Sequence, residues 1–170
     1  AFDATGGSVT FTDAGRLELA GTVTSFGTFT PSTGKVIYNG GVQNVLAENY
    51  SNLTFRSSGV KTASGNINVS NELVIRSSAT FDIAATTTTV TGTTYVNSSG
   101  TLSISTGTFD ANGTFNASGT PVGDVTFTGA GSLELGSTVT SLGNYTGSNS
   151  TILFNGSSAQ TINAGSGFTV

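Results

Sequence analysis

The chain contains no histidine, cysteine, methionine or tryptophan, and only 8% of its 170 residues are charged. Without histidine or cysteine it has no Ser-His or Cys-His nucleophile and no ordinary zinc site. It has no disulfide bond, although that does not exclude secretion. No stretch approaches the ~20 apolar residues that a membrane-spanning helix needs. We therefore expect no membrane span and a fold that does not depend on cross-links or metals.

Positive charge is also scarce, with five lysines and arginines against nine acidic residues, and no basic patch is visible in the sequence. Because nucleic-acid-binding proteins gather Lys and Arg in a patch or stripe, we expect no nucleic-acid partner. The acidic residues form no D-x-D cluster and no calcium-loop pattern. Glu18 and Glu134 hold equivalent LEL positions ~24 Å apart, too far for a glycosidase pair. We therefore predict no catalytic, cofactor-binding or metal-binding residue, and a protein that is not an enzyme.

Ser and Thr together make up about a third of the chain, and Gly is also abundant. These residues have poor helix propensity and suit half-buried strands and tight turns. Val, Ile, Leu, Phe and Tyr alternate with them along the whole chain, the period-2 pattern of strands with one buried face. The expected strands are 8–12, 16–19, 22–26, 35–38, 52–55, 66–69, 72–76, 79–83, 87–91, 93–96, 101–105, 107–109, 124–128, 132–135, 138–142, 151–154, 160–163 and 167–170.

A long internal repeat is present. Residues 7–40 match residues 123–156 without gaps, with about 19 identities in 34 positions. Beyond them, Gln43 has a looser counterpart in Gln160, and Phe2-Asp3-Ala4 resembles Phe109-Asp110-Ala111. The repeating unit is therefore about 107–117 residues long, and residues 1–170 form a single continuous array.

The chain stops at Phe168-Thr169-Val170, which resembles the expected internal strand Leu53-Thr54-Phe55. We expect either continuation in a longer tandem chain or completion by another copy. Neither Ala1–Thr5 nor Gly167–Val170 resembles the capping segment that normally covers the end of a solenoid. Open strand edges favour head-to-tail self-association into a filament.

Short strands separated by regular turns fit either a β-solenoid or a β-sandwich. The expected strands are shorter than sandwich strands usually are, and no clear Asn-Gly hairpin joins two strong strands. Stacked coils would also place the Thr and Val positions in ladders at the ~4.8 Å strand spacing. The sequence therefore predicts an all-β parallel β-helix, a β-solenoid of about seven to eight coils with about 20–24 residues each, with a sandwich as the alternative.

The strings VTFTGAGSLELGSTVTSLG and NLTFRSSGVKTASGNINVSNEL resemble tandem repeats of large secreted bacterial surface proteins, the adhesin-like proteins of the Bacteroidetes type. This resemblance spans nearly the whole chain. It implies surface display, tandem repetition and an adhesive or structural role, and it names no ligand. We therefore expect an extracellular, cell-surface structural protein that builds or extends a filament or an adhesin stalk.

Two alternatives remain. A glycan- or surface-binding adhesin module would show a cluster of exposed aromatic residues. An ice-binding solenoid would align its Thr-x-Thr triplets on one face, although they are unevenly spaced; the triplets begin at Thr10, Thr22, Thr28, Thr126 and Thr138. Asn-x-Ser/Thr motifs would be glycan acceptors in a secreted protein, or arise by chance in so polar a chain; they begin at Asn49, Asn52, Asn68, Asn97, Asn112, Asn116, Asn144, Asn149 and Asn155.

Overall fold

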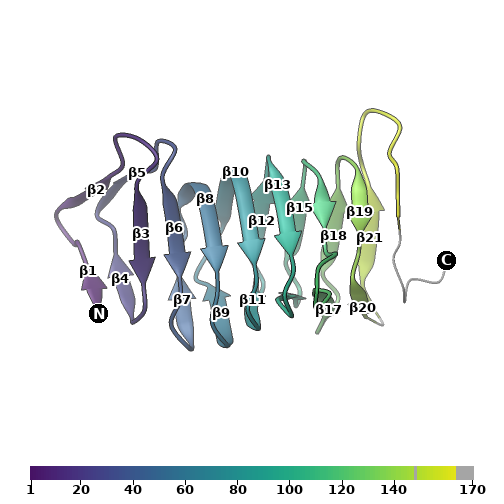
Figure 1. Ribbon diagram of the computed structural model, residues 1–170, viewed down its shortest axis with the longest axis horizontal. Helices are drawn as coiled ribbons and strands as arrows, with labels where there is room; N and C mark the ends of the chain where they lie inside the picture. The colour runs from purple at the N-terminus through teal and green to yellow at the C-terminus, as the bar shows by residue number, and fades with distance from the viewer. Residues whose placement is uncertain (148, 164–170) are drawn as a thin grey trace.

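The computed structural model describes residues 1–147 and 149–163 as a stack of short strands with no helix in these ranges, running from the N-terminus at the left of Figure 1 to the right. Every strand pair within them is parallel. The parallel β-solenoid is therefore confirmed, and the sandwich alternative, which requires antiparallel sheets, is wrong. The expected strand 167–170 lies outside the described residues.

Among the described residues, each of the first seven coils contributes one strand to each of three faces, and an eighth coil contributes strands to the first two faces only. The first face consists of β1 (Phe2–Asp3), β4 (Val23–Ser25), β7 (Gln43–Val45), β9 (Gly59–Ala63), β11 (Ala79–Asp82), β14 (Thr101–Ile104), β17 (Asp124–Phe127) and β20 (Asn144–Thr146). The second consists of β2 (Ser8–Thr10), β5 (Thr28–Thr30), the first halves of β8 (Asn49–Phe55) and β10 (Ile67–Ile75), β12 (Thr87–Val90), β15 (Thr108–Ala111), β18 (Ser132–Leu135) and β21 (Thr151–Phe154). The third consists of β3 (Arg16–Leu19), β6 (Lys35–Tyr38), the second halves of β8 and β10, β13 (Thr93–Val96), β16 (Phe115–Asn116) and β19 (Val139–Ser141).

The coils differ in length by several residues. Val36 pairs with Leu53, whereas Phe115 pairs with Val139, so the step in residue number from one coil to the next is not constant. Most of the paired strands keep one register along their length, so the extra residues lie mainly in the corners between faces. We number the coils 1 to 8 from the N-terminus, so that coil 1 holds β1 to β3 and coil 7 holds β17 to β19.

The core is a set of apolar ladders inside the coils. On the third face, Leu53 and Leu73 pair in register and are fully buried. The rings of Phe55 and Phe81 stack with centroids 4.3 Å apart. Inward residues are buried because strand alternation sends every second side chain into the interior.

The corner between the third and first faces repeats in successive coils. It carries Arg56-Ser57-Ser58, Arg76-Ser77-Ser78 and Asn97-Ser98-Ser99. Ser57, Ser77 and Ser98 all have positive φ, between 49° and 66°. A short polar side chain tolerates this left-handed backbone better than a branched one does, so the Ser pairs shape the corner.

Five expected strands have the bounds that the sequence predicted: 16–19, 35–38, 93–96, 132–135 and 151–154. The expected strands 66–69 and 72–76 form one strand, β10, bent between two faces. Residues 160–163 form only an isolated bridge, between Ile162 and Val139. The strands β1, β5, β7, β9, β16 and β20 lie outside the expected set, and most contain few large apolar residues, as QNV in β7 shows.

Candidate functional sites: a stacking edge and a basic groove

The two copies of the repeat share their local contacts. The side chain of Gln43 accepts a hydrogen bond from the Gly40 N–H and donates to the carbonyls of Leu19 and Gly21. Gln160 accepts from the Gly156 N–H and donates to two carbonyls of the coil before it. Each Gln therefore ties a corner to the preceding coil in the same way.

The equivalence also includes the first strand, but with a different partner from the one that the sequence indicated. Asp3 accepts hydrogen bonds from the N–H and hydroxyl of Thr5, and Asn116 accepts the same two bonds from Ser118. Both strands also shift register at the same point against β4 and β19. The counterpart of Phe2-Asp3-Ala4 is thus Phe115-Asn116-Ala117, and not the segment that begins at Phe109.

One edge of coil 1 has no strand on it among the described residues. β2 pairs only with β5, and β3 pairs only with β6. Their repeat counterparts β17 and β18 pair on both sides, and on the N-terminal side they pair with β14 and β15 of coil 6. We call the free side of β2 and β3 the stacking edge; it lies at the N-terminal end of the stack (Figure 1).

Apolar residues at the stacking edge are only partly covered. Val9, Phe11 and Leu17 pack against the core but are half-buried. Their counterparts in coil 7 are covered by coil 6: Val125 and Leu133 are fully buried, and Phe127 is 7% exposed. In the second copy of the repeat, the residues at these positions pack against a preceding coil. The stacking edge therefore carries equivalent apolar residues without such a coil on them.

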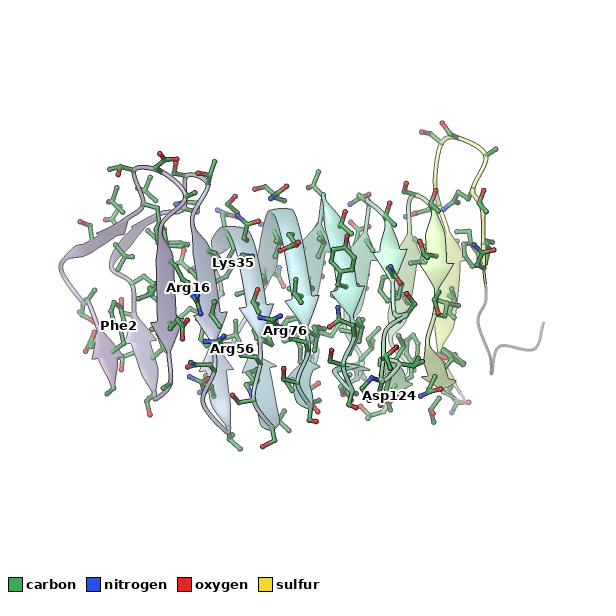
Figure 2. The ribbon with its side chains drawn as sticks, viewed as in Figure 1. Phe2, Arg16, Lys35, Arg56, Arg76 and Asp124 are labelled. Atoms are coloured by element: carbon green, nitrogen blue, oxygen red, sulfur yellow. The ribbon has the colours of Figure 1, made fainter. Side chains whose placement is uncertain are left out.

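The second feature is a groove of about 770 Å³ on the outer side of the third face. Four of the five lysines and arginines line it, namely Arg16, Lys35, Arg56 and Arg76, and they lie on the same face across β3, β6, β8 and β10 (Figure 2). The sequence-based expectation that no basic patch exists is therefore wrong. We call this feature the basic groove.

The floor of the basic groove is formed by outward residues of successive coils. Ile37 and Thr54 are register partners, and each is only 3% exposed. Ile37 lies outside the hydrophobic core cluster, so it is covered from the solvent side. Long side chains stand at both ends of the strands, with Arg16 and Lys35 at the beginning and Arg56 and Arg76 just past the end.

Two carboxylates neutralise part of this positive charge. Glu18 contacts Arg16, lies 2.5 Å from an Arg56 nitrogen and accepts a 3.0 Å hydrogen bond from Asn39. Lys35 Nζ lies 3.2 Å from Glu72 Oε1. Arg76 is exposed and makes no ion pair and no side-chain hydrogen bond with the described residues. Of the two carboxylates, Glu72 lines the groove and Glu18 pairs with its cations from beside it. The four cations and these two carboxylates together carry a net charge of +2 in a chain of net charge −4.

The fifth cation, Lys61, lies in the interior. Its side chain is fully buried, in register with Gln43 and Phe81, and its Nζ donates to the carbonyls of Ser57 and Gly59. Burial lowers the pKa of Lys61, because desolvation disfavours the charged form. No carboxylate pairs with it among the described residues.

The remaining residues singled out from the sequence are dispersed. Glu18 and Glu134 lie in coils 1 and 7 on different faces. The Thr-x-Thr triplets fall on all three faces, so they form no single flat array. Of the Asn-x-Ser/Thr asparagines, Asn52 is buried and Asn97 and Asn116 are half-buried, whereas the other six are exposed.

The described residues contain no cluster of His, Cys, Asp and Glu suited to a metal ion, and no helix in that part of the chain has the length and apolarity to cross a membrane.

Sequence spacing would have revealed the basic groove. Arg16, Lys35, Arg56 and Arg76 follow one another at nearly equal intervals, each close to the length of one coil.

The chain was compared with protein-family models, curated proteins and solved structures, and it matches none of them.

Proposed function

We propose that this chain is a non-catalytic structural protein whose solenoid lengthens when the stacking edge binds a coil of a second copy. The observation that carries this proposal is the contrast between Leu17, half-buried at the edge, and Leu133, fully buried beneath coil 6. An unpaired strand edge is a template for strand addition. Here the apolar side chains beside that edge supply the burial that such pairing needs.

An extracellular, cell-surface location belongs to the same proposal. It rests on the resemblance to secreted bacterial surface repeats and on a composition without cysteine and methionine, the residues most easily oxidised. A stack of hydrogen-bonded coils forms a rod whose length grows by ~4.8 Å with each added coil of about 20 residues. Immunogold labelling of intact cells checks the location, and label confined to the cell interior would contradict it.

Glycines supply a direct test of stacking. A Cβ on Gly123 would lie 2.1 Å from the Val96 carbonyl oxygen of the preceding coil, whereas a Cβ on Gly7 would meet only the Ala4 oxygen, at 3.4 Å. The two positions are equivalent in the repeat, since a Cβ on Gly27 would lie 2.1 Å from the Gly7 oxygen and one on Gly143 would lie 2.2 Å from that of Gly123. Gly7→Ala therefore fits the isolated chain but places a methyl group where a stacked coil would lie.

The experiment compares the wild type with Gly7→Ala by negative-stain microscopy and sedimentation over a range of concentrations. We expect rods longer than one chain for the wild type and single chains for Gly7→Ala, with unchanged circular dichroism. At concentrations low enough for both to be single chains, the two should also have the same melting temperature. Gly123→Ala, the matched variant inside the stack, should lose more than ~2 kcal/mol of stability. The proposal is overturned if the wild type stays monomeric throughout, or if Gly7→Ala assembles as the wild type does.

A further inference from the structure

The basic groove brings together three polar groups that the fold itself leaves unused. Arg76 in coil 4 and Tyr95 and Asn97 in coil 5 line it side by side, because Val74 pairs with Tyr95 and the next residues continue the register. None of the three side chains makes a hydrogen bond or ion pair with the described residues. A guanidinium, a phenol hydroxyl and a carboxamide are thus available together at one end of the groove.

The groove cations are not required by the packing of the coils. In the second copy of the repeat, Arg16 is replaced by Ser132 and Lys35 by Thr151, while the strands β18 and β21 keep the same pairing and apolar pattern. Glu18 and Asn39 keep their mutual hydrogen bond in both copies, as Glu134 and Asn155. The same strand pairing therefore forms where the groove cations are replaced by Ser132 and Thr151.

From this arrangement we infer that the basic groove binds an anionic polysaccharide, one that carries carboxylates separated by several hydroxyl groups, as a polyuronate does. Arg76 is the group that would meet a sugar carboxylate, since guanidinium and carboxylate match in a two-bond geometry. The Asn97 amide and the Tyr95 hydroxyl would bond sugar hydroxyls, and the ring of Tyr95 offers an apolar face to a pyranose.

The shape of the groove suits an extended polymer. Its lining comes from five successive coils, so it runs along the solenoid axis for about 19 Å at the ~4.8 Å coil spacing. Polar and charged groups line both of its sides, and its floor is partly apolar at Ile37 and Val74. A chain of sugars laid along the axis would meet a new set of side chains at each coil.

The hydrogen-bonding groups of the groove favour a polyuronate over a nucleic acid. Glu18 and Glu72 lie beside the cations, and each can accept a hydrogen bond from one of the many hydroxyl groups of a sugar chain. Single-stranded nucleic acids are held by several stacking aromatics, and among the described residues Tyr95 is the one aromatic residue that lines the groove.

The experiment measures binding of polygalacturonate by calorimetry to the full chain in the Gly7→Ala background, so that assembly does not interfere. A neutral glucan, a sulfated dextran and a single-stranded oligonucleotide serve as competing probes. We expect polygalacturonate to bind, and its affinity to fall by tenfold or more between roughly 50 mM and roughly 500 mM NaCl, because salt screens exposed charges.

Arg76→Gln removes the unpaired cation, and we expect it to weaken polygalacturonate binding about tenfold while leaving the melting temperature unchanged. Thr87→Glu is the matched control, because it changes the net charge by the same amount at an exposed position of the second face. Equal affinities of the two variants would overturn the assignment to the groove. Preference for the oligonucleotide, or equal binding of the neutral glucan, would overturn the ligand class. Rod assembly in the wild-type background tests the stacking proposal separately.

Discussion

Two leucines at equivalent positions of the repeat allow the energy of coil stacking to be measured. Leu133 is fully buried between its register partners Phe109 and Ile152. Leu17 has the same sequence context but only one register partner, Val36. Removing a buried leucine side chain leaves a cavity, so Leu133→Ala should cost about 3 kcal/mol of unfolding free energy. Leu17→Ala should cost about half of that, ~1.5 kcal/mol, because water already reaches one side of it.

The assay is urea unfolding followed by circular dichroism, with both substitutions made in the Gly7→Ala background to keep the chain monomeric. Because each coil contacts only its neighbours, one end of the stack can unfold before the rest. Hydrogen exchange of the amides in coils 1 and 7 should therefore be measured alongside urea unfolding, so that local stability is determined at each site. In the assembling background, Leu17→Ala should also raise the concentration needed for rods to form. If Leu17→Ala lowered the unfolding free energy of the monomer as much as Leu133→Ala does, Leu17 would already be fully buried in the single chain. The reasoning about the stacking edge would then be wrong.

Further outcomes follow from three buried polar side chains. Lys61→Met should stabilise the chain by about 1 kcal/mol at neutral pH, because it removes a buried charge that no carboxylate compensates. Because burial lowers the folded-state pKa of Lys61, wild-type stability should rise as pH climbs from that folded pKa to the ordinary value near ~10.4; an identical rise in Lys61→Met would contradict this. Thr88→Val should stabilise by roughly 1 kcal/mol in thermal unfolding, because the buried Thr88 hydroxyl has no hydrogen-bond partner in the described residues. Gln43→Ala should cost about 2 to 3 kcal/mol, because it leaves the Gly40 N–H and two carbonyls without their partner; unchanged urea unfolding would refute that role.

The fold could be predicted from the sequence where strands carry large apolar residues in alternation. RLEL in β3 and SLEL in β18 show the pattern clearly, and their expected bounds agree with the structure. The strand β9, with the sequence GVKTA, gives no such signal, because its inward positions hold Lys61 and Ala63. It is a strand because β7 and β11 pair with it on both sides, and that tertiary effect is not encoded locally.

The basic groove was missed for a related reason. Arg16 and Arg76 are far apart in the sequence, so composition and local runs give no sign that they share a face. Two residues separated by a whole number of coil lengths in the sequence lie on the same face, so the coil length must be known before such residues can be aligned. The coil length expected from the sequence, about 20 to 24 residues, is close to the interval between the cations and would have aligned them. The unpaired state of Arg76, by contrast, depends on side-chain geometry that sequence spacing does not supply.

The repeat and the coil are out of phase, and this bears on how a longer array would present its surface. β3 lies on the third face of coil 1, but its counterpart β18 lies on the second face of coil 7. β2 and β17 differ by one face in the same direction. The second copy is therefore turned by a third of a turn relative to the first, and three repeats are needed before a feature returns to its starting face.

Stacked copies that kept this relation would carry their basic grooves on three sides of the rod in succession. Such a rod could meet anionic polymer from any direction, whereas a repeat in phase with the coil would place every groove along one line. Averaged images of assembled rods should then show a rotation of about a third of a turn between neighbouring copies, together with the ~4.8 Å coil spacing along the axis. Copies related by translation alone would show that assembly uses a different contact from the one within the repeat.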